Sequence, residues 1–343
     1  MPRAVRAPRR ASVVPVETPL IARVFAALAD GRFHSGEALA RTLGVSRSAI
    51  WKSVAALKAL GSELHAVRNR GYRLAHGSEP LDSGRILERL TPDARALVAR
   101  IDSVWSIDST NTALLGRANP PHGTCEVLLT EYQTAGRGRR GRTWLAPPGG
   151  AICLSLSWSF QEVPQDLAAL GLAMGVCALR ALRVHGFDGV TLKWPNDLLV
   201  AERKLGGVLI DLRAESAGPA SVVIGIGLNV SLGAALLGQI AAGGTAATDL
   251  ASTHRPLPAR NALAAALLSA CVGGLAAFAR EGLKPFVEDW RAADALRGRA
   301  VSVSAADGVA RGIARGIDLR GALMLETPAG LRRFISGDVS VRL

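Results

Sequence analysis

The stretch from Gln133 to Arg142 reads Gln-Thr-Ala-Gly-Arg-Gly-Arg-Arg-Gly-Arg, so three glycines alternate with four arginines. An apolar run that is typical of a strand, Glu126–Glu131, comes just before it. Glycine lets the backbone approach a ligand closely, and a guanidinium group presents a planar fork to a carboxylate or a phosphate. We therefore predict a mobile, anion-binding loop at the end of a buried strand.

Two other interpretations of this loop fit its surroundings less well. An RGG-like disordered tract that binds RNA is long and repetitive, whereas this stretch is short and lies between apolar segments. A Walker A loop ends in Gly-Lys-Ser or Gly-Lys-Thr and opens a helix, and the sequence indicates neither feature here. The loop is therefore expected to belong to a folded domain.

Strand-like and helical runs alternate around the loop. The hairpin-like spacing of the later runs favours a mixed or antiparallel sheet over a fully parallel one. The expected strands are Glu126–Glu131, Ile152–Trp158, Val190–Lys193, Leu198–Val200, Lys204–Asp211 and Val222–Leu228, and the expected helices lie near Asp166–Val184 and Ala262–Ala279.

Three further polar motifs occur in this region. The run Lys193–Asp197, Lys-Trp-Pro-Asn-Asp, leaves a strand; a lysine there is usually solvated, but the Trp-Pro pair could hold it rigidly toward a ligand. The run Asp108–Asn111 is an N-cap motif, which also leaves backbone N–H groups for a polar ligand. The run Gly225–Asn229 ends a strand, where its two glycines admit a ligand closely. The first motif alone is moderate evidence for a binding site, and each of the other two is weak alone.

The first part of the chain contains a helix-turn-helix pattern. Helical runs at Leu20–Leu28 and Ala38–Leu43 are followed by a tight turn at Gly44. Ser46 is a natural N-cap for a third helix, which Gly61 ends. Two short strands then form a hairpin, so the order predicts a winged helix-turn-helix domain.

The surface of this domain is expected to be basic. Residues 1–80 carry 13 Lys and Arg against 5 Asp and Glu, a net charge of +8 out of +13 for the chain. A three-helix domain with a solvated charged face is the plainer interpretation, but excess cations, a recognition helix and a basic wing together favour DNA. The expected DNA contacts lie at the start of the third helix and at the hairpin tip: Arg47, Ser48, Lys52, Arg68 and Arg70.

Composition excludes several other classes of protein. The chain has 343 residues and is 49% hydrophobic, which rules out global disorder and leaves room for two or three domains. Four distant cysteines form no Cys-x-x-Cys pair, so neither a zinc site nor a disulfide framework is expected. Ala262–Ala279 is uncharged but has apolar positions at helical spacing, which predicts a buried helix rather than a membrane span. A cytoplasmic protein is expected.

Taken together, these motifs resemble those of the biotin-protein ligases in order and approximate spacing. The likeness rests on the runs 108–111, 133–142, 193–197, 204–207 and 225–229. With a winged helix in front, the chain resembles the bacterial bifunctional form, which is both a biotin-[acetyl-CoA-carboxylase] ligase and a biotin operon repressor. The resemblance covers about residues 18–343.

The resemblance implies an α+β protein of three folded domains. A winged helix-turn-helix domain (18–78) would follow a basic, disordered extension (1–17), and a mixed-sheet α/β catalytic domain (79–292), related to class II aminoacyl-tRNA synthetases and lipoate ligases, would come next. The tail (293–343) would form a small SH3-like barrel. Turn signals in the tail separate five short expected strands: Ala300–Ser304, Ala310–Ile317, Leu323–Glu326, Leu331–Ile335 and Val339–Leu343.

The implied reaction has two steps and needs no protein nucleophile. Biotin attacks the α-phosphate of MgATP to give biotinyl-5'-AMP and pyrophosphate, and a lysine of the biotin carboxyl carrier protein then takes the acyl group. Fixed cations would stabilise charge on the phosphate oxygens. The implied catalytic residues are Arg137, Arg139 and Lys193. The implied biotin ligands are Ser109, Thr110, Asn111, Gln133, Arg137, Gly138, Arg139 and Lys193, and those for ATP or the adenylate are Arg139, Arg140, Arg142, Trp144, Lys193, Asn196 and Asn229.

The resemblance also implies partners. These are operator DNA and a second copy of the chain when the adenylate is bound, with no membrane and no protein-built metal site; Mg²⁺ would accompany ATP. A ligase whose winged helix no longer represses is the main alternative. A second alternative is a regulator that binds biotin without catalysis. A lipoate ligase would share the fold of the catalytic domain but should lack both the winged helix and this Gly/Arg loop.

Overall fold

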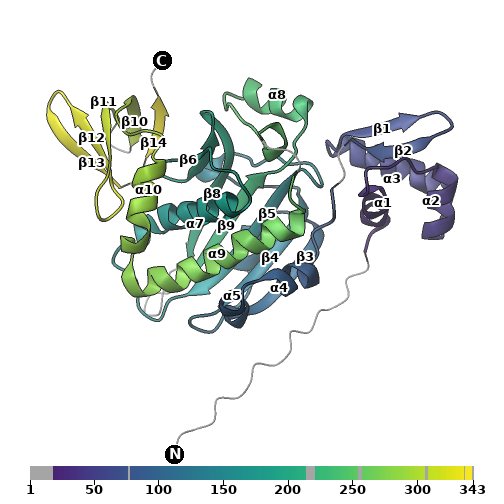
Figure 1. Cartoon of the computed structure of the whole chain (residues 1–343), viewed down its shortest axis with the longest axis horizontal. Helices are drawn as coiled ribbons and strands as arrows, with labels where there is room; N and C mark the ends of the chain where they lie inside the picture. Colours follow the sequence, from purple (N-terminus) through teal and green to yellow (C-terminus); the bar gives the residue numbers. More distant parts are fainter. Residues whose placement is uncertain are drawn as a thin grey trace, which may run out of the picture.

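The computed structural model describes residues 18–75, 78–213, 221–253, 257–305, 308–335 and 337–341. The basic extension predicted at residues 1–17 lies outside these ranges. Three separate β-sheets of two, seven and five strands follow one another along the described chain. Figure 1 shows the small N-terminal and C-terminal parts on opposite sides of the central one.

The N-terminal part is a winged helix-turn-helix, as the sequence predicts. Ser35 and Ser46 accept hydrogen bonds from backbone N–H groups at the starts of α2 and α3, and Gly44 ends α2 with a φ of 67°. Apolar side chains from all three helices pack with Leu74 into one core. The elements are α1 (Leu20–Leu28), α2 (Gly36–Leu43), α3 (Arg47–Ala59), β1 (Leu64–Val67) and β2 (Gly71–Leu74).

The central sheet is mixed, as predicted. Its order is β3-β4-β5-β9-β8-β7-β6, with β3 and β4 parallel and the other neighbours antiparallel. Because of these directions, the ends of β3, β4, β7 and β9 lie at the same edge as the starts of β5, β6 and β8. The strands are β3 (Val98–Ile107), β4 (Cys125–Gln133), β5 (Ala151–Ser159), β6 (Val190–Lys193), β7 (Asp197–Val200), β8 (Arg203–Arg213) and β9 (Ser221–Asn229).

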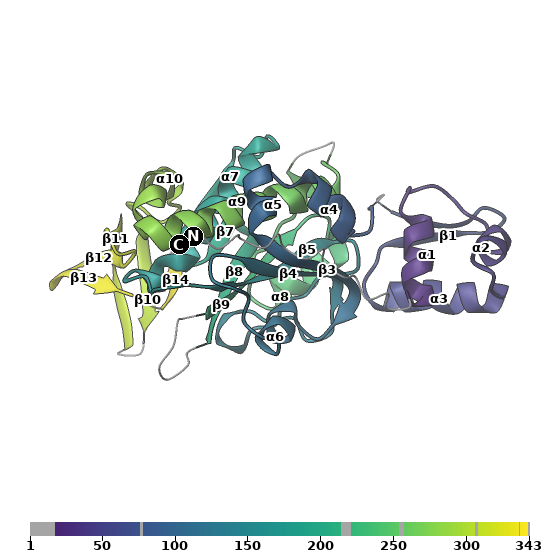
Figure 2. The same cartoon turned by 90° about the horizontal axis from the view of Figure 1, so that it is seen from below.

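Helices cover both faces of this sheet (Figure 2). Helices α7 and α9 pack on each other over one face, and α4 and α5 pack on α9. Helix α6 lies on the other face, where Leu114 packs with Leu128 and Val223. The helices of the central part are α4 (Ser83–Arg89), α5 (Pro92–Leu97), α6 (Thr110–Leu115), α7 (Leu170–Val184), α8 (Ala234–Ala242), α9 (Arg260–Glu281) and α10 (Val287–Ala293).

Two helical windows, Leu167–Val184 and Arg260–Glu281, are long and apolar enough to cross a membrane by length and composition alone. In the fold, however, 67% of the first window and 56% of the second are buried inside the protein. Leu263, Leu267 and Leu275 of α9 are completely buried. The prediction of a buried helix at Ala262–Ala279 is therefore confirmed.

The C-terminal part is a small antiparallel sheet, consistent with the predicted small β domain. Its order is β13-β12-β11-β10-β14, and within the described residues no ladder joins the outer strands to close a complete barrel. The Trp194 indole N–H donates to the Gly321 carbonyl at 3.1 Å and ties this sheet to the central part. The strands are β10 (Ala300–Ala305), β11 (Gly308–Ile317), β12 (Leu323–Thr327), β13 (Gly330–Phe334) and β14 (Asp338–Val341).

Candidate functional site

The polar motifs of the sequence meet around one cleft of about 1050 Å³. Residues of the central sheet, the loop 136–145, the segment after α8 and the C-terminal sheet line it. Every residue for which the sequence predicts a role with biotin or ATP lines this cleft: Ser109, Thr110, Asn111, Gln133, Arg137, Gly138, Arg139, Arg140, Arg142, Trp144, Lys193, Asn196 and Asn229.

A buried polar cluster forms the wall beside α6. The Thr110 backbone N–H donates to Gln133 Oε1 at 2.9 Å. Ser155 Oγ lies 2.6 Å from Thr110 Oγ1 and 2.5 Å from Asn111 Oδ1, and Asn111 Nδ2 donates to the Asp211 carboxylate at 2.9 Å. Each side chain is thus oriented by its neighbour, which gives the wall a fixed pattern of donors and acceptors.

An ion pair connects this wall to the glycine and arginine loop. Arg137 Nη1 lies 3.2 Å from Asp211 Oδ2, and Asp211 is the same carboxylate that binds Asn111. The sequence analysis did not single out Asp211 or Ser155, because each lies inside a strand. A charged residue within the apolar run of β8 is the signal that could have identified Asp211.

The other loop arginines reach the C-terminal sheet. Arg139 Nη1 donates to Asn196 Oδ1 and to the Gly337 carbonyl, both at 3.4 Å, and Arg140 Nη2 donates to the Ser304 carbonyl at 3.3 Å. The sequence predicts no regular structure in this loop, but Arg139–Gly141 forms one 3-10 turn with Arg140 at a φ of 53°. The cleft is therefore bordered by two domains, which the sequence analysis did not foresee.

Lys193 stands at the rim of the cleft in a tightly held turn. It ends β6 and is paired in register with Asp197, which begins β7. The peptide bond after Trp194 is cis, and the Asn196 amide donates to a carbonyl of β8 at 2.7 Å. Asp197 Oδ1 forms an ion pair with Lys204 Nζ at 2.7 Å. The backbone around Lys193 is thus fixed from both sides.

The two glycines of β9 leave room for two side chains of the cleft. A Cβ on Gly225 would lie 2.3 Å from Asn111 Oδ1, and a Cβ on Gly227 would lie 2.6 Å from the Trp144 ring. Both glycines also line the cleft, where the sequence predicts that they admit a ligand closely. That role stays a prediction, and the structure adds that the two glycines make room for Asn111 and Trp144.

Two buried side chains complete the floor of the cleft. Asn229 Nδ2 donates to the Thr248 carbonyl at 2.9 Å and fixes the segment that follows α8. Cys153 is the one cysteine among the described lining residues, and burial raises the pKa of its thiol to about 11. The thiol is therefore protonated near neutral pH and is not a nucleophile there.

The residues predicted to contact DNA lie on the surface of the winged helix. In the first turns of α3, the side chains of Arg47, Ser48 and Lys52 are exposed. In the hairpin between β1 and β2, those of Arg68 and Arg70 are exposed. The helix and the hairpin of this one small domain thus each carry an exposed basic group. Trp51 lies among the helix residues and has 61% of its surface exposed. The sequence analysis did not single out this tryptophan, although it falls outside the buried face of α3.

Comparisons with known proteins agree with this arrangement. Residues 104–229 match the biotin/lipoate A/B protein ligase family, residues 24–73 match an HTH domain, and residues 297–342 match the biotin protein ligase C terminal domain. The bifunctional ligase/repressor BirA of Salmonella typhimurium is 36% identical, over 92% of this chain and 95% of that protein. BirA of Escherichia coli is 35% identical, over 93% and 96%. A biotin protein ligase from Aquifex aeolicus, in complex with biotin and ATP, has a TM-score of 0.60 and 26% identity, over 71% of this chain and 98% of that one.

Proposed function

Since this chain belongs to the family of the bifunctional ligase/repressors, we propose that it is an ATP-dependent biotin ligase that also represses transcription. The observation that carries the ligase function is the cleft, where several arginines and a lysine stand opposite a buried polar wall. Biotin has both an apolar ring system and a carboxylate, and such a cleft offers partners for each end.

The polar wall is suited to biotin. Ser109 caps α6, and with Thr110, Asn111 and Gln133 it presents hydroxyl, amide and backbone groups toward the cleft. These groups would bind the ureido ring or the valeryl chain. Gly138 would let the loop backbone close over the ligand.

The loop and the strand ends are suited to the first chemical step. The biotin carboxylate attacks the α-phosphorus of ATP, a P–O bond forms, and the bond to pyrophosphate breaks. Negative charge grows on the phosphate oxygens, where Arg137, Arg139 and Lys193 would stabilise it. The remaining ATP ligands would be Arg140, Arg142, Trp144 stacked on adenine, Asn196 and Asn229.

The second step needs no covalent intermediate on the protein. The amine of an acceptor lysine attacks the acyl carbon of biotinyl-5'-AMP, and AMP leaves. We propose that the acceptor is the biotin carboxyl carrier protein of acetyl-CoA carboxylase, in the cytoplasm. The protonated Cys153 thiol takes no part.

Mg²⁺ would enter this site with ATP. The described residues contain no group of three or more His, Cys, Asp or Glu side chains that could hold a metal ion. Two carboxylates of the cleft region, Asp197 and Asp211, already face Lys204 and Arg137. Phosphate oxygens would therefore supply most of the ligands, as is usual for this ion, and its charge would add to that of the arginines.

The repressor function rests on the exposed face of the winged helix. Arg47, Ser48, Lys52 and Trp51 would enter the major groove, and Arg68 and Arg70 would contact the backbone beside it. One winged helix offers few contacts, so two copies related by a two-fold axis would bind an inverted repeat. We propose that biotinyl-5'-AMP favours this homodimer.

Biotin-dependent ATP/pyrophosphate exchange tests the ligase function, and lipoate is the matched control substrate. Exchange with biotin, followed by labelling of the carrier protein, is the expected result. Absence of exchange would leave only a biotin-binding regulator, and exchange with lipoate instead would indicate a lipoate ligase. Binding to an inverted repeat upstream of biotin genes separates a repressor from a ligase whose winged helix no longer represses.

A further inference from the structure

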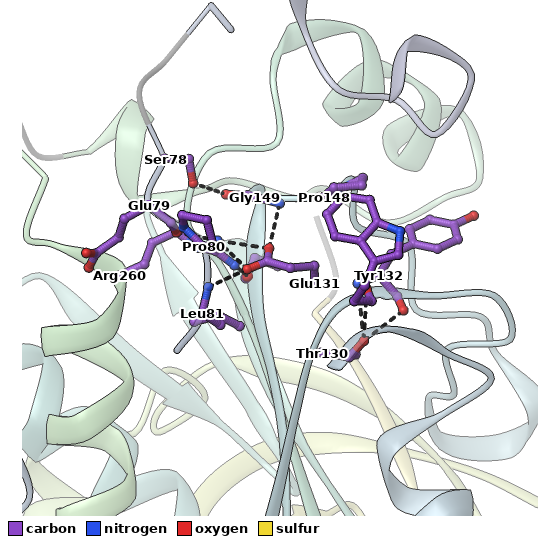
Figure 3. Close-up of polar contacts among 12 residues, drawn as sticks. Ser78, Glu79, Pro80, Leu81, Thr130, Glu131, Tyr132, Pro148, Gly149 and Arg260 are labelled. Atoms are coloured by element: carbon purple, nitrogen blue, oxygen red, sulfur yellow. Dashed lines mark hydrogen bonds and ion pairs between the residues drawn. The ribbon is translucent and has the colours of Figure 1, made fainter. Parts of the chain in front are cut away.

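A buried ion pair lies beside the linker between the winged helix and the central domain (Figure 3). Glu131 of β4 and Arg260, the first residue of α9, are 3.0 Å apart, and their side chains are only 5% and 3% exposed. Burying two charges is costly unless other hydrogen bonds satisfy them. The hydrogen bonds that surround the two side chains must therefore offset the cost of burying their charges.

Hydrogen bonds of the two side chains hold four segments of the chain together. The Glu131 carboxylate accepts hydrogen bonds from the N–H groups of Leu81 at 2.5 Å and Gly149 at 3.1 Å. Arg260 donates to the Glu79 carbonyl at 3.0 Å and to a carbonyl at the start of β5 at 2.7 Å. The linker that follows the winged helix is thus fixed to β4, α9 and the segment 147–150.

Gly149 also contacts the winged helix itself. Its carbonyl accepts a hydrogen bond from Ser78 Oγ at 3.0 Å, and the Ser78 N–H donates to the carbonyl of Ala29, just after α1. A Cβ on Gly149 would lie 2.8 Å from the ring of Phe25, which also packs on Trp105 of β3 with ring centroids 5.5 Å apart. A shift of Gly149 would therefore move the winged helix.

The same segments continue into the cleft. Glu131 lies two residues before Gln133 on β4, and the segment 147–150 follows directly on the loop that carries Trp144. The Gly150 carbonyl accepts hydrogen bonds from the two residues after Asn229, both at 2.9 Å. Strand β4 and the segment 147–150 thus connect the cleft to the buried pair directly, and β9 connects to it through Gly150.

We propose that Glu131 and Arg260 are positioning residues that couple occupancy of the cleft to the orientation of the winged helix. The inference rests on the proposed function, since it explains how the adenylate would affect DNA binding. A ligand that orders the ends of β4 and β9 and the loop also fixes Gly149, and Gly149 fixes Ser78 and Phe25. By linkage, a correctly placed pair of winged helices would in turn favour the bound ligand.

The test is Glu131→Gln, which keeps the shape and removes the charge. We expect the ratio of operator affinities measured with and without biotin plus ATP to fall about tenfold. Pyrophosphate exchange should keep the wild-type KM for biotin, because Glu131 does not line the cleft. Ser78→Ala, which removes one hydrogen bond and leaves the ion pair intact, should lower the ratio less.

Leu275→Ala is the control for a loss of stability, because it creates a cavity in the core of α9 away from the pair. It should lower the melting temperature and leave the ratio unchanged. If it lowers the ratio as much as Glu131→Gln does, or if both Glu131→Gln and Ser78→Ala keep the wild-type ratio, the proposal is wrong.

Hydrogen exchange separates this inference from the repressor function. The proposal expects biotin plus ATP to protect Leu20–Leu28 in the wild-type chain and not in Glu131→Gln. If no operator responds to the ligand, the repressor function fails, yet this protection still supports the coupling. Equal protection in the two proteins would overturn it.

Discussion

The proposed ligand cleft and the surface that we propose to contact DNA, the DNA-facing surface (Arg47, Ser48, Lys52, Arg68 and Arg70), are built in opposite ways. The cleft brings together side chains from many separate segments, between residue 109 and residue 339, and hydrogen bonds connect several of them. The DNA-facing surface uses neighbouring residues of one helix and one hairpin, and these side chains extend into solvent. Outside the glycine and arginine loop, the cleft is fixed before binding, whereas the exposed surface acquires its contacts on binding.

This difference predicts how the two regions respond to substitution. In a preorganised cleft, each charged group acts on a developing charge with little water present, so its loss is costly. Exposed contacts to DNA are individually weaker and depend on salt, because they replace counterions on phosphates. Single substitutions should therefore reduce catalysis by larger factors than DNA binding.

Lys193→Gln should cause the largest effect. The side chain stands at the rim of the cleft on a fixed turn, and we expect its loss to lower pyrophosphate exchange by about a hundredfold or more. The fold should remain, which circular dichroism and the melting temperature would check. Near-normal exchange would show that Lys193 does not act on the reacting phosphate.

Arg139→Gly should release the adenylate early. Arg139 lines the cleft and reaches both Asn196 and the C-terminal sheet, so its loss removes a charged group and frees the loop. We expect biotinyl-5'-AMP to dissociate roughly tenfold to a hundredfold faster, since hydrogen bonds to charged groups contribute ~1.5–3 kcal/mol. Stopped-flow release of the adenylate measures the rate, and nonspecific lysine labelling of a bystander protein should follow.

Hydrogen exchange adds a check on the same loop. Residues 136–142 should exchange quickly in the free protein and become protected with biotin plus ATP, because three glycines raise the entropy of the free loop. Equal protection with and without ligand would contradict a mobile loop and remove the reason for early release.

Arg47→Ala and Lys52→Ala should lower operator affinity by about tenfold each, and each should reduce the slope of log affinity against log salt by about 1. Operator titrations at several salt concentrations measure both quantities. Binding of the wild-type chain should also steepen with protein concentration if two copies bind together. Pyrophosphate exchange should be unchanged in both variants; if exchange falls with DNA binding, the two regions are not separate.

The sequence predicts the winged helix well because its signals are local. Ser35, Ser46 and Gly44 act within a few residues of their own positions, as caps do. Strand β3 was missed for the opposite reason: Arg100 and Asp102 interrupt its apolar pattern, and its burial comes from β4 and two helices. Such burial depends on tertiary neighbours, which periodicity does not show.

The site shows the same limit. Its glycines, arginines and Lys193 are unusual for strands and could be recognised in the sequence. Ser155 could not, and Asp211 shows only a charge within an apolar run. Its role stays hidden because only the register of the sheet brings Asp211 to Arg137, 74 residues away in the chain. The contacts of Gly225 and Gly227 with Asn111 and Trp144 could not be predicted either, since a glycine in the sequence does not show which side chain packs against it.

Trp51→Ala should have the smallest effect and should differ in kind from the arginine and lysine variants. An exposed indole on a recognition helix can pack on thymine methyl groups in the major groove, and its loss should weaken operator binding about fivefold, or ~1 kcal/mol. Because the indole carries no charge, the salt slope should stay at the wild-type value. Val184→Ala is the matched control, since Val184 is 81% exposed at the end of α7, outside the winged helix, and its loss should leave binding unchanged. An operator affinity equal to wild type in Trp51→Ala, or a reduced salt slope, would show that this surface contacts DNA through its charges alone.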